Sequence, residues 1–308
     1  MPFSPTEKIW MDGELVDWAD AQIHVLTHSL HYGTAVFEGI RAYATASGPA
    51  IFRLGEHVSR FDRSARTLMM KLPFSEAEIL EAIRTTVRST GLDACYIRPI
   101  AYYGYGDLGI SPLTCEVHVA VAAWPWAAYL GDEAIAKGAR VKVSSWARND
   151  PRSVPAGAKA TGSYINSSLA KVEALLAGYE EAVMCTTDGF LSECTGENLF
   201  LVRNGRLLTP DPSASVALEG VTAESVMTIA RDLGFDVAEE LLRRTDLYIA
   251  DEAFLTGTAA EIVPISSVDD RTIGDGGPGP MTRAIQEVFF KTVRGEVEQY
   301  KDWLDYVN

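Results

Sequence analysis

The chain has 308 residues, and its 42 Asp and Glu residues outnumber its 27 Lys and Arg residues, which gives a formal net charge of −15. This length is typical of about two domains, and the hydrophobic content of 47% is ordinary for a globular protein. The acidic balance argues against nucleic acids and anionic membrane surfaces as partners. The N-terminus lacks an apolar signal core, and the most apolar run, 119–130, is too short to span a bilayer, so the sequence predicts a cytoplasmic protein.

The first 123 residues predict a small domain of mixed helices and strands. In chain order we expect a hairpin over 9–16 around an Asp-Gly turn, a helix over 28–38, a strand over 40–43, helices over 55–70 and 75–89, and strands over 95–103 and 116–124. Residues 124–135, which are rich in aromatic side chains, break this pattern and are interpreted as a connector. Its aromatic residues either cover a joint between domains or line a ligand cleft.

Residues 136–308 predict a larger second domain. The expected elements are a strand over 140–146, a helix with the apolar face Ile165, Leu169, Val172 and Leu176, hairpins around the Asp-Gly at 188 and the Asn-Gly at 204, a helix over 222–233, strands over 252–256 and 262–265, and an amphipathic helix over 280–293. Hairpins join antiparallel strands, so the sheet is not of the all-parallel kind. The sequence therefore predicts the α+β class.

Lys159 lies in a run of small residues, 156–162 (AGAKATG). Glycine and alanine leave room for a bulky planar group to reach the amine, although a lysine in an ordinary flexible loop is the alternative. Glu193 lies in a second segment that could return beside it. A lysine that forms a Schiff base, together with a carboxylate that keeps a ring nitrogen protonated, is the minimum set for pyridoxal phosphate chemistry.

A cofactor phosphate requires N–H groups, hydroxyls and a fixed cation. Residues 218–222 (LEGVT) place a glycine and the hydroxyl of Thr222 at the start of an expected helix, where an anion is favoured. Thr256 and Thr258 flank another glycine after a strand, and Arg60 could supply the cation. The alternatives are a simple helix cap at Thr222, an ordinary turn over 256–258 and a solvated basic helix face around Arg60.

Two further side chains are candidates. Tyr164 lies five residues after Lys159, where a phenol could hydrogen-bond the ring oxygen of the cofactor. Arg98 ends an apolar strand, so its charge requires either a structural or a substrate carboxylate. His28 and His31 lack partners at ligand spacing and are interpreted as structural, so no metal is expected. Neither a Cys-x-x-Cys pair nor a dinucleotide or P-loop motif is present.

Six segments together resemble the branched-chain amino acid aminotransferases, a family of fold-type IV pyridoxal-phosphate enzymes with the fold of D-amino acid aminotransferase. They are 31–41 (HYGTAVFEGIR), 96–99 (YIRP), 125–131 (PWAAYLG), 158–160 with 163–167 (AKA, SYINS), 196–200 (GENLF) and 257–261 (GTAAE). The resemblance covers nearly the whole chain. It implies a small α/β domain over 1–123, a connector over 124–135, and a large α/β domain over 136–308 that carries the Schiff-base lysine.

The resemblance also implies a role for each site residue. Lys159 carries the pyridoxal 5'-phosphate and later moves a proton, Glu193 faces the ring nitrogen, and Tyr164 faces the ring oxygen. The ring and phosphate are held by Leu218, Arg60, Val221, Thr222 and Thr258. The substrate pocket is shaped by Tyr32, Phe37, Gly39, Tyr96, Trp126, Tyr129, Thr258 and Ala259, with Arg98 meeting the distal carboxylate of glutamate or 2-oxoglutarate.

The function that the resemblance implies is reversible transamination of Leu, Ile and Val with 2-oxoglutarate, by a homodimer or a higher homo-oligomer. A D-amino acid transaminase or an R-amine transaminase of the same fold is an alternative, and so is a non-catalytic homologue that binds a metabolite. The intact Lys159, Tyr164 and Glu193 argue against the last. Cys194 and Thr195 depart from the smaller residues that usually follow this glutamate in the family, and they leave the substrate range open.

Overall fold

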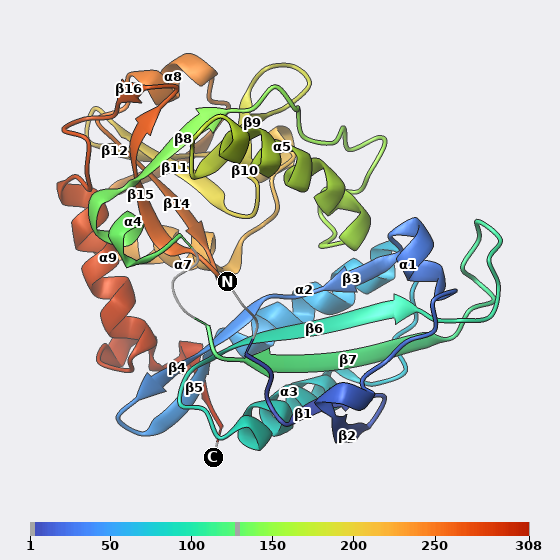
Figure 1. Ribbon diagram of the computed structural model, residues 1–308. Coiled ribbons are helices and arrows are strands. Elements are labelled where there is room, and N and C mark those ends of the chain that lie inside the picture. Colours follow the sequence, from blue (N-terminus) through green and yellow to red (C-terminus); the bar gives the residue numbers. More distant parts are fainter. Residues whose placement is uncertain (1–3, 127–129, 308) are drawn as a thin grey trace. The chain divides into compact units, whose positions relative to one another are not determined.

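The computed structural model describes residues 4–126 and 130–307. The chain divides into two compact units, whose elements are shown in Figure 1. The N-terminal unit comprises Met1–Trp126, Ala158–Gly162 and Thr292–Asn308, and the C-terminal unit comprises Ala127–Gly157 and Ser163–Lys291. Each unit contains both helices and strands, so the protein belongs to the α+β class, as the sequence predicted.

An antiparallel sheet of eight strands forms the N-terminal unit. The strand order is β17 (Leu304–Tyr306), β5 (Gly48–Phe52), β4 (Ile40–Thr45), β6 (Cys95–Tyr103), β7 (Val117–Trp124), β1 (Lys8–Met11) and β2 (Glu14–Asp17), while β3 (Ala35–Phe37) pairs with β6. Strands β6 and β7 are paired along the whole of β7. The short helices of this unit are η1 (Trp18–Asp20), α1 (His28–Tyr32) and η3 (Glu298–Trp303).

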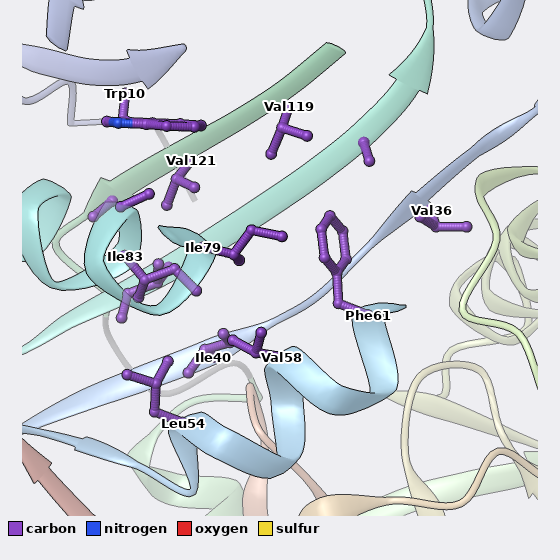
Figure 2. Close-up of a cluster of buried hydrophobic side chains, with 14 of the residues drawn as sticks. Trp10, Val36, Ile40, Leu54, Val58, Phe61, Ile79, Ile83, Val119 and Val121 are labelled. Carbon is purple, nitrogen blue, oxygen red and sulfur yellow. The ribbon is translucent and has the colours of Figure 1, made fainter. Parts of the chain in front are cut away.

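Two longer helices, α2 (Leu54–Thr67) and α3 (Glu76–Thr90), close the core of this unit. Leu54, Val58 and Phe61 recur at helical spacing on α2, and Ile79 and Ile83 do so on α3. All five side chains are buried, and Figure 2 shows them directed into one apolar cluster with side chains of the sheet. The sequence therefore correctly predicted both helices.

A mixed sheet of nine strands forms the C-terminal unit. Its order is β10 (Leu191–Cys194), β9 (Glu181–Cys185), β8 (Ala139–Val143), β15 (Glu261–Val268), β14 (Glu252–Gly257), β11 (Asn198–Arg203), β12 (Arg206–Pro210) and β13 (Asp236–Glu240), while β16 (Arg271–Thr272) pairs with β15. Strand β8 runs parallel to β9 and β15, and β12 runs parallel to β13. The other pairs are antiparallel, which confirms that the sheet is not all-parallel.

The remaining helices are α4 (Asp132–Lys137), η2 (Thr161–Ser163), α5 (Tyr164–Leu176), α6 (Pro212–Ser215), α7 (Val221–Asp232), α8 (Arg244–Tyr248) and α9 (Pro280–Val293). Among the described residues, no helix has both the length and the apolar character needed to cross a membrane.

Helix α5 buries a different face from the one that the sequence suggested. Ile165, Leu169, Val172 and Leu176 are 67%, 41%, 53% and 86% exposed in the single chain. The helix instead packs its small residues, Ala170 and Ala174, against Ala182 and Met184 of β9, and the two elements lie side by side in Figure 1. Small side chains allow the helix backbone to approach the sheet closely. The buried face of α5 therefore has no large apolar residues that would mark it in the sequence.

The helix expected over 28–38 is shorter than predicted. Helix α1 ends at Tyr32 because Gly33 adopts a left-handed conformation with φ 67°, which terminates the helical backbone. The chain then enters β3, where Ala35, Val36 and Phe37 pair with β6. This correction places Phe37 on a strand that lies next to β6.

The compact units differ from the domain boundaries expected over 1–123, 124–135 and 136–308. The segment Ala158–Gly162 belongs to the N-terminal unit, where Ala160 forms an isolated bridge to Val36. The C-terminal segment Thr292–Asn308 also belongs there, because β17 is the edge strand beside β5. Lys159 therefore lies in the N-terminal unit rather than in the unit formed by most of residues 136–308. Neither contact could be inferred from the sequence, because each joins segments far apart in the chain.

Candidate active site

The backbone of Lys159 is held by the N-terminal unit. Its N–H donates to the hydroxyl of Ser64 over 3.0 Å, and its carbonyl accepts the N–H of Phe37 over 3.1 Å. The loop also approaches the end of α1, where a Cβ on Gly33 would lie 2.8 Å from the Cα of Gly162. The Lys159 ammonium lies over the Phe37 ring, 5.0 Å from its centroid. The main chain therefore fixes the position of this segment without requiring the lysine amine.

Aromatic side chains and an arginine form a cluster beside Phe37. The Arg98 guanidinium lies 4.8 Å from the Phe37 ring centroid and 5.5 Å from that of Tyr96. The Tyr96 and Trp126 rings lie 4.8 Å apart. Gly39 is required here, because a Cβ at this position would lie 2.0 Å from the Tyr96 hydroxyl. The structure thus brings together five of the residues expected to bind substrate.

Arg98 has hydrogen-bonding capacity that the rest of the described chain does not use. Its Nε is buried and has no hydrogen-bond partner within residues 4–126 and 130–307. A buried guanidinium is costly unless an anion pairs with it. A carboxylate can supply two parallel hydrogen bonds to such a group, so Arg98 is suited to bind a carboxylate of a small molecule.

Arg60 is anchored by a fully buried carboxylate. Its Nε and Nη2 donate to the two oxygens of Glu38 over 2.7 and 2.8 Å, and His57 Nδ1 lies 2.8 Å from the same carboxylate. Burial alone would raise the pKa of Glu38, but the charge and hydrogen bonds of Arg60 and the hydrogen bond of His57 outweigh it and hold the pKa well below its usual value. Burial lowers the pKa of His57, which favours the neutral ring. The interpretation of Arg60 as part of a solvated basic face is wrong, because this side chain is buried.

Four of the nine expected substrate residues are not placed in this cluster, and two of these, Thr258 and Ala259, belong to the C-terminal unit. Tyr32 is 42% exposed, and its hydroxyl donates to the carbonyl of Leu108 over 2.9 Å. Its ring contacts His28 and His31 and, among the described residues, neither Phe37 nor Tyr96. Tyr129 lies outside the described residues.

Glu193 lies at the end of β10 in the C-terminal unit and is buried. Arg148 Nη2 lies 2.6 Å from one carboxylate oxygen. The other oxygen accepts the N–H of Leu218 over 3.1 Å and the side-chain amide of Asn198 over 3.4 Å. Arg148 is itself fixed, because its Nη1 donates to Ser167 over 2.9 Å. A guanidinium and backbone contact of this kind hold the carboxylate in one orientation.

Asn198 connects Glu193 to the segments expected to bind phosphate. Its amide donates to the carbonyl of Leu218 over 2.8 Å, and its backbone is paired with Thr256 of β14. A Cβ on Gly220 would lie 1.9 Å from Asn198 Oδ1, so this turn requires glycine. The turn leads directly into α7, whose first residues are the buried Val221 and Thr222. Thr258 and Ala259 follow Thr256 in the turn between β14 and β15, and Tyr164 begins α5.

This part of the C-terminal unit has hydrogen-bond donors that the described chain does not use. Gly220 gives α7 no side-chain cap, so the first N–H groups of the helix remain available to an anion. The buried hydroxyl of Thr256 has no hydrogen-bond partner in the part of the chain that the structure describes. Both features are expected of a site that binds a phosphate.

Further buried carboxyl groups of the C-terminal unit include those of Glu181 and Glu197. Glu181 is fully buried and accepts hydrogen bonds from Lys171 and from Thr195, each over 2.6 Å. Glu197 is also buried, and burial followed by the charge of Glu181 raises its pKa to about 8. Glu197 therefore carries a proton at pH 7. Thr195 has a structural role, because its hydroxyl donates a hydrogen bond to the buried Glu181. Burial likewise raises the pKa of the Cys194 thiol.

We expect Glu197→Gln to change how stability depends on pH. The pKa of Glu197 is about 8 in the fold and 4.5 in the unfolded chain, so its contribution to stability is fully present below about pH 4.5 and is lost as the pH rises through 8. Glutamine has no proton to lose. Relative to the native protein, the variant should therefore gain on the order of 1 kcal/mol per pH unit between these values. Urea unfolding between pH 5 and 8 measures this difference, and parallel profiles would contradict it. Glu239→Gln, on the exposed β13, is the control.

The structure identifies neighbours of the expected site residues that the sequence did not indicate: Glu38, His57, Arg148 and Asn198. Glu38 and Asn198 lie inside two of the segments that resemble the aminotransferase family, 31–41 and 196–200. The sequence, however, does not indicate which residue the Glu38 carboxylate or the Asn198 amide binds. Arg148 lies in a polar loop after β8, and no motif or pattern in the sequence indicates that it contacts Glu193. Among the described residues, no group of three or more His, Cys, Asp or Glu could hold a metal ion.

The model of the amino-transferase class IV family matches residues 35–268, and the chain belongs to this family. The chain is 46% identical to the branched-chain-amino-acid aminotransferase of Pseudomonas aeruginosa over 96% of its own length and 95% of that protein. It is 44% identical to the branched-chain amino acid aminotransferase of Escherichia coli. The crystal structure of that protein matches with a TM-score of 0.96, and the match covers 98% of this chain and 100% of that one. The crystal structure of a T.th. branched-chain amino acid aminotransferase complexed with N-(5'-phosphopyridoxyl)-L-glutamate is 49% identical, with a TM-score of 0.94 and coverages of 98% of this chain and 99% of that one.

Proposed function

We propose that this protein is a branched-chain-amino-acid aminotransferase, which transfers the amino group of Leu, Ile or Val reversibly to 2-oxoglutarate. Relatives that share 44–46% identity over almost the whole chain carry this name. The single structural observation that carries the proposal is Glu193, a buried carboxylate held by Arg148 and the Leu218 N–H. A carboxylate fixed in this way is suited to keep a pyridine nitrogen protonated.

Pyridoxal 5'-phosphate is the cofactor of this function, and the residues present fit it. When bound, it supplies an electron sink for the bonds of the substrate α-carbon. We propose that Lys159 binds the carbonyl carbon of the cofactor, Glu193 its ring nitrogen and Tyr164 its ring oxygen. The ring and phosphate contacts are assigned to Leu218, Arg60, Val221, Thr222 and Thr258. A phosphate at this position is supported by the uncapped N-terminus of α7 and by the Thr256 hydroxyl, which no group of the described chain satisfies.

The side chains of the site have separate proposed roles. With the cofactor bound, the Lys159 amine would serve as the base that takes the proton from the substrate α-carbon. Phe37, Tyr96 and Trp126 provide an apolar, aromatic surface for a branched side chain, and Gly39 keeps that surface open at Tyr96. Tyr32, Tyr129, Thr258 and Ala259 are proposed to complete the substrate pocket. Because one pocket must accept both an aliphatic side chain and a carboxylate, discrimination by shape alone is modest.

The test is to add L-leucine, without an amino acceptor, to the protein loaded with pyridoxal phosphate and to record the visible spectrum. We expect the absorbance band of the bound cofactor to disappear and the band of its amino form to grow. A band that responds to D-alanine or to an R-amine, but not to L-leucine, would identify another transaminase of the same fold. A protein that takes up no cofactor would favour the non-catalytic homologue.

Arg98→Gln should separate the two substrate classes. If Arg98 binds the distal carboxylate of 2-oxoglutarate and glutamate, losing this charge-assisted pair costs about 1.5–3 kcal/mol, or roughly a tenfold to hundredfold increase in KM. The KM for L-leucine should change little, because its side chain has no carboxylate. Steady-state kinetics with each substrate varied in turn measure this split. An equal increase in both KM values would mean that Arg98 acts on structure, and Arg88→Gln, on the exposed face of α3, is the control.

We further propose that the protein acts as a cytoplasmic homo-oligomer. The exposed apolar residues on α5, Ile165, Leu169 and Val172, form a stripe that a second copy could cover. Leu108 and Ile110 are further exposed apolar residues, in the N-terminal unit. Light scattering after gel filtration measures the mass, and a monomer of 33.5 kDa would contradict the proposal.

A further inference from the structure

The N-terminal unit contains a cavity that shares no residue with the candidate active site. Its volume is about 620 Å³, which is within the range of about 300–1,000 Å³ typical of small-molecule sites. It is bordered by the β1–β2 turn, the segment between α2 and α3, and the start of β7 with the residues before it. The lining residues are Asp12, Met69, Lys71, Pro73, Phe74, Tyr103, Leu113, Cys115, Glu116, Val117 and His118.

The charged residues of this cavity fall into two groups. Asp12 and His118 are paired with one another, because His118 Nδ1 lies 2.7 Å from Asp12 Oδ2, and the other oxygen of Asp12 accepts the N–H of Val119. Lys71 and Glu116 differ. Within the described residues, neither side chain forms an ion pair or a hydrogen bond. The cavity thus offers one cation and one anion that are available to a ligand.

The rest of the lining is apolar. Phe74 is held in place by the edge-to-face contact of its ring with Trp10, with centroids 5.0 Å apart, and Tyr103 is buried with its hydroxyl donating to the Leu68 carbonyl. Two apolar residues of the lining remain largely in solvent, since Met69 is 74% and Leu113 is 64% exposed. Met69 also has a φ of 55°, a conformation that is costly for this residue. A flexible thioether held open beside a cavity is suited to close over an apolar group.

We propose that this cavity binds a free α-amino acid with an apolar side chain. Lys71 receives the carboxylate, Glu116 receives the ammonium group, and the side chain lies against Phe74 and Tyr103 beneath Met69 and Leu113. A purely anionic or purely cationic ligand would leave one of the two charges unmatched, whereas a zwitterion matches both. If the proposed function holds, the ligand belongs to the same class as the substrates, so the cavity is a second binding site, outside the candidate active site, for the pool on which the enzyme acts. The binding itself does not depend on that function.

The test uses holoenzyme treated with borohydride, so that the cofactor is fixed on Lys159 and substrate cannot displace the amine. L-leucine is titrated into this protein by calorimetry, with L-phenylalanine as a larger probe. We expect saturable binding of at least one probe. Lys71→Met and Glu116→Gln should each weaken that binding at least tenfold. Both residues lie at exposed positions, so neither substitution should prevent folding. The matched controls, Lys137→Met and Glu133→Gln on exposed α4, should stay within twofold.

Two results would overturn the site: no heat of binding up to about 10 mM of either probe, a concentration at which even a weak site would show, or binding that neither Lys71→Met nor Glu116→Gln weakens. Failure of the proposed function is recognised separately, by a cofactor band that does not respond to L-leucine or by borohydride fixing no cofactor on Lys159. In the first case the titration is unchanged, and in the second the cavity is tested by the same titration of the untreated protein.

Discussion

Lys159→Ala should abolish turnover of L-leucine with 2-oxoglutarate, with a rate at least about 10⁴-fold below that of the native protein. The variant loses the amine that binds the cofactor and also the base that moves the substrate proton, and proton transfer alone is worth about 10²–10⁴-fold. Its fold should persist, because Ser64 and Phe37 bind the backbone of residue 159 rather than its side chain. Initial rates measured with saturating cofactor test this expectation.

Two comparisons make that result specific. Lys137→Ala, which removes an exposed ammonium from α4, should leave the rate unchanged. The melting temperature of Lys159→Ala without cofactor should lie close to that of the native protein. Residual activity within tenfold of the native rate would show that Lys159 is not the residue that carries the cofactor. A large loss of melting temperature would mean instead that its side chain supports the fold.

The sequence predicted the site residues where a local pattern had a chemical meaning. Lys159 stood out because the residues around it are small, and Arg98 because a charge in an apolar strand requires a partner. Arg98 does not end its strand as expected, since β6 continues to Tyr103. The structure supports this reasoning for Arg98, whose Nε is buried and has no hydrogen-bond partner among the described residues. In both cases the informative neighbours lie within a few residues along the chain, and such neighbours can be read from a sequence.

The partners that hold the site could not be predicted, because they are distant in sequence. Arg148 reaches Glu193 from a loop that lies far earlier in the chain, and Glu38 meets Arg60 across 22 positions. Glycines gave a similar difficulty. Gly39 and Gly220 have no unusual φ, and their role appears only from what a Cβ would strike, the Tyr96 hydroxyl and the Asn198 side chain.

Helix α5 shows the limit of periodicity. Four large apolar residues at helical spacing correctly predicted a helix, yet they face away from the core of their own unit. The buried face carries Ala170 and Ala174, whose contribution to a hydrophobic pattern is small. A pattern of large apolar residues indicates a surface that will be covered, but it cannot say whether the cover is the same chain or a second copy. This ambiguity is the reason that the stripe supports an oligomer.

Glu38→Gln should lower the free energy of unfolding by about 3–5 kcal/mol at pH 7. Glu38 is fully buried between Arg60 and His57, and removal of one partner of a buried ion pair leaves the other charge uncompensated. Burial lowers the pKa of His57, so its ring is neutral at pH 7 and must donate its Nδ1 proton to the carboxylate. Glutamine preserves the volume of Glu38 but can accept through one oxygen only. Chemical unfolding of the two proteins measures the difference.

The same substitution has a definite pH dependence. Because the pKa of Glu38 is lowered in the fold from its ordinary 4.5, its stabilising contribution is fully present above that value and is lost as the pH falls toward the folded pKa. The gap between native protein and variant should therefore be constant above about pH 5.5 and narrow on acidification. Glu81→Gln, which removes an exposed partner of Arg88, should cost no more than about 1 kcal/mol. If Glu38→Gln cost no more than this control, the buried pair would not be what orients Arg60, and the phosphate role proposed for that arginine would lose its structural support.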